Sequence, residues 1–311
     1  MPDDPPQQKV IVICGPTGVG KTEWAVRLGS ELSGEIVSAD SMQIYRYMDI
    51  GTAKPTPEEM RQLPHHMIDI VDPDADFSAG QYARMAREKI DKLHERRILP
   101  LIVGGTGLYI KACLHGLFRE RSVNDEVLKR LTREAEQNGA ERLHGRLQAC
   151  DPEAARRINP RDVFRIVRAL EVYETTGKPL SVHQKAHQFT GSRYDALKLC
   201  LYTEREFLYD RINRRVDAMM AAGLVDEVRG LLAMGYAGDL KSMQAIGYRH
   251  VVSCLTGQWS WEEALGTLKR DTRRYAKRQL TWFRADPGIK WIDKTGGMDK
   301  IRSVIRRFVE A

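Results

Sequence analysis

Short apolar runs alternate with amphipathic stretches along the first part of the chain. Residues 10–13 and 99–103 are apolar, which predicts two buried strands. An amphipathic run that predicts a helix follows each of them, at 23–32 and at 108–114. The same patterns predict further strands at 35–38 and 67–71 and a further helix at 79–97. This alternation predicts an α/β fold with a parallel sheet.

The pattern changes from Arg119 onward, because no strand-like run interrupts the following segment. Amphipathic stretches separated by glycine and proline predict four helices, at 124–137, 140–149, 152–158 and 162–175. We therefore expect a helical insertion domain over residues 118–193. The core domain would then consist of residues 1–117 and 194–311.

Strands and helices alternate again after the insertion. The patterns predict strands at 197–202 and 289–292, and helices at 204–220, 224–232, 261–283 and 298–309. These elements are expected to complete the α/β core.

The loop after the first strand has the pattern G-x-x-x-x-G-K-T and runs into a helix. Its members are Gly15, Pro16, Thr17, Gly18, Val19, Gly20, Lys21 and Thr22. Between a buried strand and a helix, this pattern predicts a phosphate-binding loop, in which backbone N–H groups and the helix N-terminus face an anion. Lys21 can reach terminal phosphate oxygens, and the Thr22 hydroxyl suits Mg²⁺. The loop alone does not identify the phosphorylated ligand.

Two other strands end in residues that should face the same crevice as this loop. Asp40 follows strand 35–38, where a carboxylate can act on a bound substrate; alternatively, it only N-caps the next turn. Strand 99–103 ends in Gly104-Gly105-Thr106-Gly107, without the Asp that usually holds Mg²⁺ in ATPases. Small residues there would let a substrate approach the backbone, with Thr106 as a hydrogen-bonding group, unless the segment is an ordinary glycine turn.

The formal net charge of +7 and the pI near 9.1 favour a polyanionic partner, although charge alone does not select one. The most basic helix, 261–283, carries Arg270, Arg273, Arg274, Lys277 and Arg278, interleaved with Tyr275, Trp282 and Phe283. Such a helix suits a nucleic-acid backbone with unstacked bases, and the alternative is a solvated helix with core aromatics. One face of the insertion helix 162–175 carries three guanidinium groups, from Arg161, Arg165 and Arg168. The alternative is an ordinary solvated face, with Glu171 paired to one of these arginines.

Other features exclude some classes of protein. No apolar run approaches the roughly 18 residues of a membrane span, so we expect no membrane association. The N-terminus lacks the apolar core of a signal peptide, and the five cysteines are scattered without metal-ligand spacing. These features predict free thiols and a cytoplasmic location. His65 and His66 are adjacent, which favours a structural role over metal binding.

Seven motifs in this order resemble those of the tRNA dimethylallyltransferases (isopentenyl-diphosphate:tRNA transferases). They are GPTGVGKT at 15–22, SADSMQIYRYMDIGTAKP at 38–55, PHHMIDI at 64–70, GGTGLY at 104–109, RALEVYETTGKPLS at 168–181, AIGYR at 245–249 and KRQLTWFR at 277–284. The resemblance covers nearly the whole chain, from Ile11 to Trp291. It implies a P-loop NTPase-like parallel sheet core flanked by helices, with an all-helical insertion domain.

The resemblance also implies a reaction. The loop would hold the diphosphate of dimethylallyl diphosphate, and the exocyclic N6 amine of the adenosine immediately 3′ of the anticodon would attack the allylic carbon. Asp40 matches the family's proposed base, and Thr106 matches a residue that hydrogen-bonds at the reacting centre. Lys21, Arg215 and Mg²⁺ on Thr22 would neutralise the leaving diphosphate. Because no triphosphate is hydrolysed, the missing acidic residue after strand 99–103 is explained.

The partner implied by the resemblance is the anticodon stem-loop of tRNA, with the target adenine taken out of the stack. Residues matched to tRNA contacts are Asp40, Ser41, Met42, Gln43, Phe164, Arg165, Ile166, Val167, Arg168, Gln244, Gly247, Tyr248, Arg249, Lys277, Arg278, Gln279, Trp282 and Arg284. Phe164 departs from the family pattern, which has glutamine there, and a phenyl ring can stack on a base. We expect a bacterial form, which would lack the C-terminal zinc finger of eukaryotic relatives, and we expect a monomer.

Two other functions are compatible with parts of the sequence. An ATP-dependent small-molecule or nucleotide kinase of the P-loop class would explain the phosphate loop but not the basic helix. An RNA-binding module with a vestigial phosphate loop would bind RNA in a salt-sensitive manner and form no product.

Overall fold

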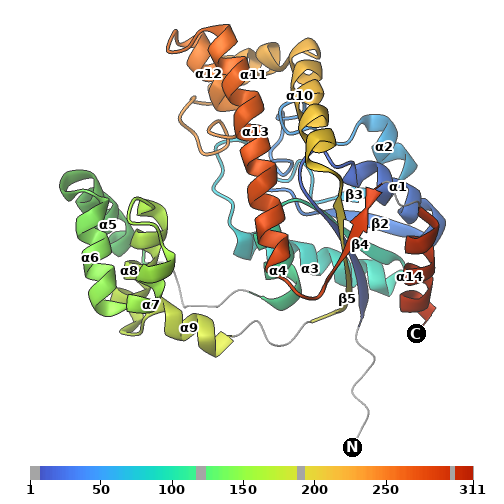
Figure 1. The fold of residues 1–311 in the computed structure, drawn as a ribbon, viewed down its shortest axis with the longest axis horizontal. Helices are drawn as coiled ribbons and strands as arrows, with labels where there is room; N and C mark the ends of the chain where they lie inside the picture. Colours follow the sequence, from blue (N-terminus) through green and yellow to red (C-terminus); the bar gives the residue numbers. More distant parts are fainter. Residues whose placement is uncertain (1–7, 117–123, 188–192, 295–297, 311) are drawn as a thin grey trace, which may run out of the picture. The chain divides into compact units, whose positions relative to one another are not determined.

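The computed structural model describes residues 8–116, 124–187, 193–294 and 298–310 (Figure 1). The chain forms two compact units: a core unit, Met1–His115 with Ser192–Ala311, and a helical unit, Gly116–Gly191. The boundaries expected from the sequence lie within a few residues of these. Residues 1–7, which include most of the polar N-terminal segment, lie outside the described part.

A six-stranded sheet in the order β3-β2-β4-β1-β5-β6 forms the centre of the core unit. The strands are β1 (Lys9–Cys14), β2 (Gly34–Ser38), β3 (His65–His66), β4 (Leu99–Gly104), β5 (Asp195–Tyr202) and β6 (Ile289–Asp293). All neighbouring pairs are parallel. The predicted α/β class is therefore confirmed, and the carboxyl ends of β1, β2 and β4 meet at one edge of the sheet.

One predicted strand is wrong. Residues 67–71 do not extend the sheet, because Met67 and Asp69 have φ angles of 65° and 53°, in the left-handed region. The edge strand is instead the short pair His65–His66 beside β2. Val71 makes only an isolated bridge with Tyr45.

Helices cover both faces of the sheet (Figure 1). Those of the core unit are α1 (Lys21–Leu32), α2 (Pro57–Gln62), α3 (Ala79–Glu95), α4 (Gly107–His115), α10 (Arg205–Ala221), α11 (Leu224–Ala233), α12 (Tyr248–Leu255), α13 (Trp261–Arg284) and α14 (Met298–Glu310). Capping boxes start α2, α3 and α13, at Thr56, Ser78 and Ser260. Short α2 and α12 were not predicted from the sequence.

Alternate residues of β1 point to opposite faces and enter different cores. Ile11 and Ile13 pack with α1, α10 and α14, whereas Val10 and Val12 pack with α3 and α4. A third cluster joins Ile44 to α10, α11, α12 and α13, which extend beyond the sheet (Figure 1). This cluster places α10 and α13 beside the carboxyl edge of the sheet.

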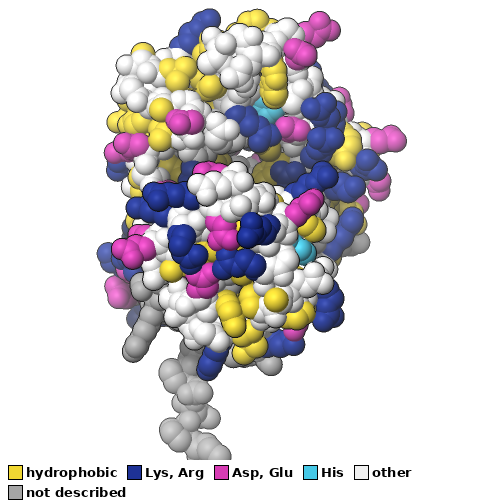
Figure 2. Space-filling view, turned by 90° about the vertical axis from the view of Figure 1, so that its left-hand side faces the viewer, with side chains coloured by type: hydrophobic (Ala, Val, Ile, Leu, Met, Phe, Trp, Pro, Cys, Tyr) yellow, Lys and Arg dark blue, Asp and Glu magenta, His cyan; other side chains and the backbone are white. Residues whose placement is uncertain are grey.

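The helical unit has its own core. Its helices are α5 (Asp125–Asn138), α6 (Ala140–Cys150), α7 (Pro152–Arg157), α8 (Val163–Thr176) and α9 (Leu180–His187). Leu131, Leu143 and Ile166 are fully buried in its centre. On its surface Arg146 pairs with Glu134 and Glu174. On the face drawn in Figure 2, Lys and Arg side chains lie among Asp and Glu, so much of the positive charge there has acidic neighbours.

Two predictions on composition can be compared with the structure. No helix within the described ranges is long and apolar enough to cross a membrane. All five cysteines are free, as predicted, and three of them, Cys14, Cys113 and Cys200, are buried in the core unit.

Candidate active site

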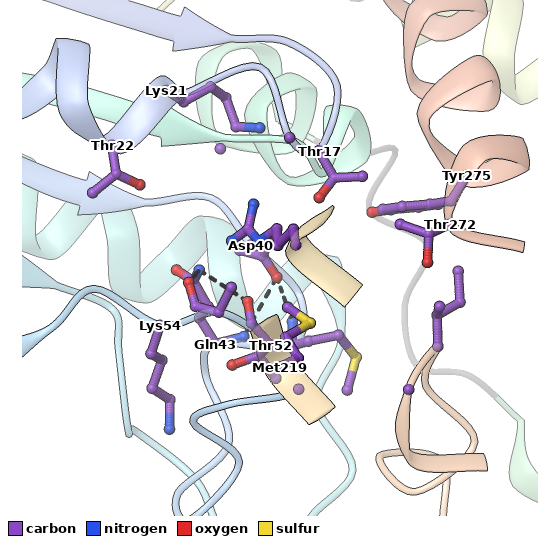
Figure 3. A pocket seen from close by; sticks show the side chains of 18 of the residues that line it. Thr17, Lys21, Thr22, Asp40, Gln43, Thr52, Lys54, Met219, Thr272 and Tyr275 are labelled. Carbon is purple, nitrogen blue, oxygen red and sulfur yellow. Dashed lines mark hydrogen bonds between the residues drawn. The ribbon is translucent and has the colours of Figure 1, made fainter. Parts of the chain in front are cut away.

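A cavity of about 570 Å³ opens at the carboxyl edge of the sheet. Its walls are formed by the loop after β1, the turn after β2, residues 51–55, helix α10, residues 244–248 and helix α13. Figure 3 shows Thr17 and Lys21 on one side of Asp40, and Tyr275 and Thr272 of α13 on another. All of its lining residues belong to the core unit.

The loop after β1 adopts a conformation that requires glycine. Gly15, Gly18 and Gly20 have φ angles of 144°, 81° and 94°. A Cβ atom on Gly15 would also lie 2.6 Å from the carbonyl oxygen of Leu201 in β5. The loop is therefore held tightly against the sheet, and it leads directly into the N-terminus of α1, as an anion cradle requires.

Lys21 turns back onto its own loop in this structure. Its Nζ donates hydrogen bonds to the carbonyl oxygens of Gly15 at 3.1 Å and Pro16 at 2.9 Å. Burial lowers the pKa of Lys21 to about 8, while the nearby Asp40 carboxylate opposes this shift. Thr22 follows it and lines the same cavity.

The lowered pKa of Lys21 predicts a pH-dependent affinity for inorganic pyrophosphate. A polyanion favours the charged ammonium of Lys21, so binding raises the pKa of this group. The affinity that Lys21 contributes is therefore lost as the pH rises through the pKa that Lys21 has without the ligand. We expect little change in this contribution below about pH 8 and a loss approaching tenfold per pH unit above it. Calorimetric titrations of wild type and Lys21→Met isolate this effect, because ionisation of pyrophosphate is common to both. Parallel pH profiles would contradict the prediction.

Asp40 caps the turn after β2, as one reading of the sequence expected, and it also lies in the cavity. Its Oδ1 accepts hydrogen bonds from the backbone N–H groups of Met42 at 2.9 Å and Gln43 at 3.4 Å, so it caps the next turn. It also lines the cavity, opposite Lys21 (Figure 3). Capping by one carboxylate oxygen leaves the other oxygen for a substrate.

Thr106 lies next to the Asp40 turn but is not among the residues that line the cavity. Its N–H donates to Ala39 O at 3.1 Å, and its Oγ1 accepts from Ser41 N at 3.0 Å. The hydroxyl also donates to Ser41 Oγ at 3.3 Å. In this state Thr106 therefore supports the turn that carries Asp40.

The glycines around Thr106 accommodate groups of the protein itself, and Gly104 also lines the cavity. A Cβ on Gly104 would lie 2.1 Å from Ala39 O, and one on Gly105 2.1 Å from Gln279 Nε2. A Cβ on Gly107 would lie 2.0 Å from the indole nitrogen of Trp282. Small residues here allow α13 to pack directly on the end of β4.

Two arginines of α10 enter the cavity one helical turn apart. Arg215 was predicted, and Arg211 is an addition whose signal in the sequence was only its spacing. Burial lowers the pKa of Arg215, and the nearby Asp40 carboxylate opposes this shift. Arg211 lies over the phosphate loop, since a Cβ on Gly20 would be 3.3 Å from its Nη2 atom.

A known protein family matches most of the chain. Residues 43–286 match the family described as IPP transferase. The chain belongs to this family.

Named members of the IPP transferase family are similar over almost the whole length. The tRNA dimethylallyltransferase of Desulfosudis oleivorans is 59% identical, with 98% of this chain and 97% of the relative covered. The crystal structure of a tRNA isopentenylpyrophosphate transferase from Bacillus halodurans is 43% identical, with a TM-score of 0.72 and coverage of 98% and 96%. A eukaryotic dimethylallyltransferase acting on tRNA is 29% identical, with a TM-score of 0.81 and coverage of 96% and 78%. The structural relatives support the P-loop NTPase-like fold.

Several residues expected to contact tRNA are exposed or line the cavity. Lys277, Arg278, Trp282 and Arg284 of α13 are exposed, as are Phe164 and Arg165 of α8. Asp40, Ser41, Met42, Gln43, Gln244 and Gly247 line the cavity. Arg168 and Arg249 are already paired, with Glu171 and Asp271 respectively.

Four residues expected to contact tRNA have buried side chains, and two of them, Tyr248 and Gln279, nevertheless line the cavity. Ile166 and Val167 lie in the core of the helical unit, on the face of α8 opposite Phe164 and Arg165. Tyr248 is fully buried and donates a hydrogen bond to Glu227. Gln279 is only 6% exposed. Motif membership alone does not distinguish the exposed face of a helix from its buried face.

Gln279 connects two parts of the site from the buried face of α13. Its Oε1 accepts from Thr17 N at 2.8 Å, and its Nε2 donates to Gly105 O at 3.0 Å. The hydroxyl of Tyr275, one turn earlier, is within hydrogen-bonding reach of Thr106 and Gln279, and burial raises its pKa. Helix α13 therefore fixes the position of the phosphate loop relative to the Thr106 turn.

Proposed function

We propose that the protein transfers the dimethylallyl group of dimethylallyl diphosphate to the exocyclic N6 amine of the adenosine immediately 3′ of the anticodon in tRNA, releasing diphosphate. The observation that carries this proposal is the cavity in which a phosphate loop and the Asp40 carboxylate face each other. Membership of the IPP transferase family and the names of its relatives support the same reaction. The protein is then a prenyltransferase that modifies tRNA.

The phosphate loop and α10 form the leaving-group side of the cavity. Backbone N–H groups at the start of α1 would bind the diphosphate, and Lys21 would exchange two loop carbonyls for phosphate oxygens. Arg211 and Arg215 of α10 line the cavity and add positive charge near this loop. Because charge on diphosphate grows as the bond to the allylic carbon breaks, these contacts stabilise the transition state more than the bound substrate.

Asp40 lies on the acceptor side. The N6 lone pair forms the new C–N bond, the C–O bond to diphosphate breaks with its electron pair leaving on oxygen, and the amine proton passes to Asp40. The turn that Asp40 caps fixes the direction of its carboxylate. Met219, Val216 and Leu268 line the cavity nearby and suit the apolar allyl chain.

The residues present are compatible with Mg²⁺. In the described ranges no group of three or more His, Cys, Asp or Glu side chains forms a dedicated metal site. Mg²⁺ commonly needs only one or two protein ligands when substrate phosphates and water supply the rest. The Thr22 hydroxyl at the start of α1 is the protein ligand we propose, and the ion would supply positive charge to the leaving diphosphate.

We further propose that the anticodon stem-loop binds the exposed basic face of α13 and the exposed Phe164 and Arg165 of α8. The five free thiols support a cytoplasmic site of action. Because one chain supplies all of the cavity lining, we propose that the monomer is active.

One assay tests the reaction directly. The protein is incubated with tRNA, labelled dimethylallyl diphosphate and Mg²⁺, and both labelled RNA and free diphosphate are measured. Transfer predicts equal amounts of the two products and no need for ATP. RNA binding without label, or ATP consumption without tRNA, would instead favour the RNA-binding module or the kinase.

The α13 surface makes a separate prediction. Lys277→Ala or Arg278→Ala should weaken tRNA binding and reduce the slope of log affinity against log salt concentration by about one, since each removes one phosphate contact. Pyrophosphate affinity should stay unchanged in Lys277→Ala, because Lys277 is not among the residues that line the cavity. Lys290→Ala, at an exposed position of β6, is the matched control. An unaltered salt slope in the α13 variants would exclude this face as the tRNA surface.

A further inference from the structure

Glu227 of α11 accepts four hydrogen bonds from two neighbouring segments. Its Oε2 accepts from the N–H groups of Asp49 at 2.9 Å and Ile50 at 2.7 Å, and its Oε1 accepts from Gly51 N at 3.1 Å. The Tyr248 hydroxyl donates to Oε1 at 2.6 Å. Successive N–H groups that converge on one carboxylate fix the backbone of residues 49–51.

The segment held in this way does not adopt a relaxed extended or helical course. Ala53 has a φ of 49°, which is unfavourable for a residue with a Cβ and has to be held by its surroundings. Gly51 packs against the Tyr248 ring, since a Cβ there would lie 2.5 Å from a ring carbon. Burial, together with the adjacent Glu227, raises the pKa of Tyr248, so its hydroxyl remains a donor.

The same segment is connected to Asp40 through Gln43. Gln43 Nε2 donates to the carbonyl oxygens of Thr52 at 3.4 Å and Ala53 at 3.2 Å. The backbone N–H of Gln43 in turn donates to Asp40 Oδ1 at 3.4 Å. Asp40, Gln43 and Thr52 lie together on one side of the cavity (Figure 3).

We propose that Glu227 is a positioning residue, which sets the Asp40 carboxylate through residues 49–53 and the Gln43 side chain. It does so from outside the site, because Glu227 is not among the residues that line the cavity. The phosphate loop lies on a different wall and makes none of these contacts. Loss of Glu227 therefore impairs proton removal from the acceptor and leaves the diphosphate cradle intact.

This inference rests on the proposed transfer reaction, and its test uses the full chain. Glu227→Ala is expected to lower kcat by about 10- to 100-fold, because small misplacements of a reacting group cost this much. Glu227→Gln should have a smaller effect, since the amide oxygen still accepts two of the bonds. The Kd for inorganic pyrophosphate should change by less than about twofold in both.

Asp226→Asn is the matched control on the same helix. The Asp226 side chain is 80% exposed and pairs only with Arg229 among the described ion pairs. We expect its kcat and pyrophosphate affinity to match those of wild type. Gln43→Leu removes the hydrogen bonds at the other end of this connection, so it should also lower kcat. Because both changes break the same connection, the double variant with Glu227→Ala should be no slower than the slower single variant.

The outcomes separate this inference from the reaction itself. Absence of transfer by wild type would refute the reaction. An active wild type with undiminished kcat in Glu227→Ala would overturn the positioning role, as would fully multiplicative losses in the double variant. A parallel loss of pyrophosphate affinity would show a general structural defect instead. If Glu227→Ala fails to fold, the same comparison is made with Glu227→Gln, which retains the side-chain volume.

Discussion

Replacing Asp40 by asparagine is expected to lower kcat by about 10²–10⁴-fold, the range for loss of a general base. Asparagine keeps an oxygen that can accept from Met42 N and Gln43 N, so the turn remains capped. The free energy of unfolding and the affinity for pyrophosphate should therefore stay close to wild type. Single-turnover transfer to tRNA measures the chemical step without contributions from product release.

Asp40→Ala provides the comparison that separates the two roles of this residue. Alanine removes the cap as well, and it should cost a further ~0.5–2 kcal/mol of stability. If capping were the only role, the asparagine variant would be active and only the alanine variant impaired. Near-normal turnover by Asp40→Asn would remove Asp40 from proton transfer.

The second large effect is expected at Arg215, where Arg215→Gln should lower kcat/KM by about 10²–10³-fold. Its guanidinium lies in the cavity with Arg211, where burial strengthens its interaction with the departing diphosphate. Removing this charge destabilises the transition state more than the bound substrate. We therefore expect kcat to fall by a larger factor than the affinity for pyrophosphate.

Arg214→Gln is the control for this charge. Arg214 is the preceding residue of α10, with a side chain that is 73% exposed and paired with Asp210. Loss of an exposed pair of this kind changes stability by at most about 1 kcal/mol and should leave transfer unaffected. Equal losses in the two variants would indicate a general effect of positive charge on tRNA binding.

The sequence was sufficient for those parts of the fold that local patterns determine. The phosphate loop was predicted because its glycines, its lysine and its position between strand and helix form one contiguous signal. Four of the five described helices of the insertion were predicted because apolar spacing and glycine or proline boundaries are also local, whereas α9 (Leu180–His187) was not predicted. The strand expected at 67–71 failed because Met67 and Asp69 take left-handed φ angles, which apolar content does not reveal.

The parts of the site that were missed depend on contacts between distant segments. Glu227 and the N–H groups of residues 49–51 are separated by more than 170 positions, and Glu227 looks like any polar residue of an amphipathic helix. Gln279 and Thr17 are separated by 262 positions. In both cases a side chain bonds to backbone groups, which carry no residue-specific pattern. The motif at 277–284 includes Gln279 without indicating what it contacts, and no motif includes Glu227.

Helix α13 has two faces with opposite tolerance to sequence change. Ala276, Gln279 and Phe283 are buried, and Gln279 bonds to the phosphate loop, so few side chains can replace them. Arg274, Lys277 and Arg278 are exposed on the same helix, where substitution disturbs little packing. Under the proposed role of this face in tRNA binding, the chain can vary its affinity for RNA by drift at surface positions while the catalytic geometry stays constant. This separation makes α13 a suitable place to alter tRNA preference by directed evolution without rebuilding the active site.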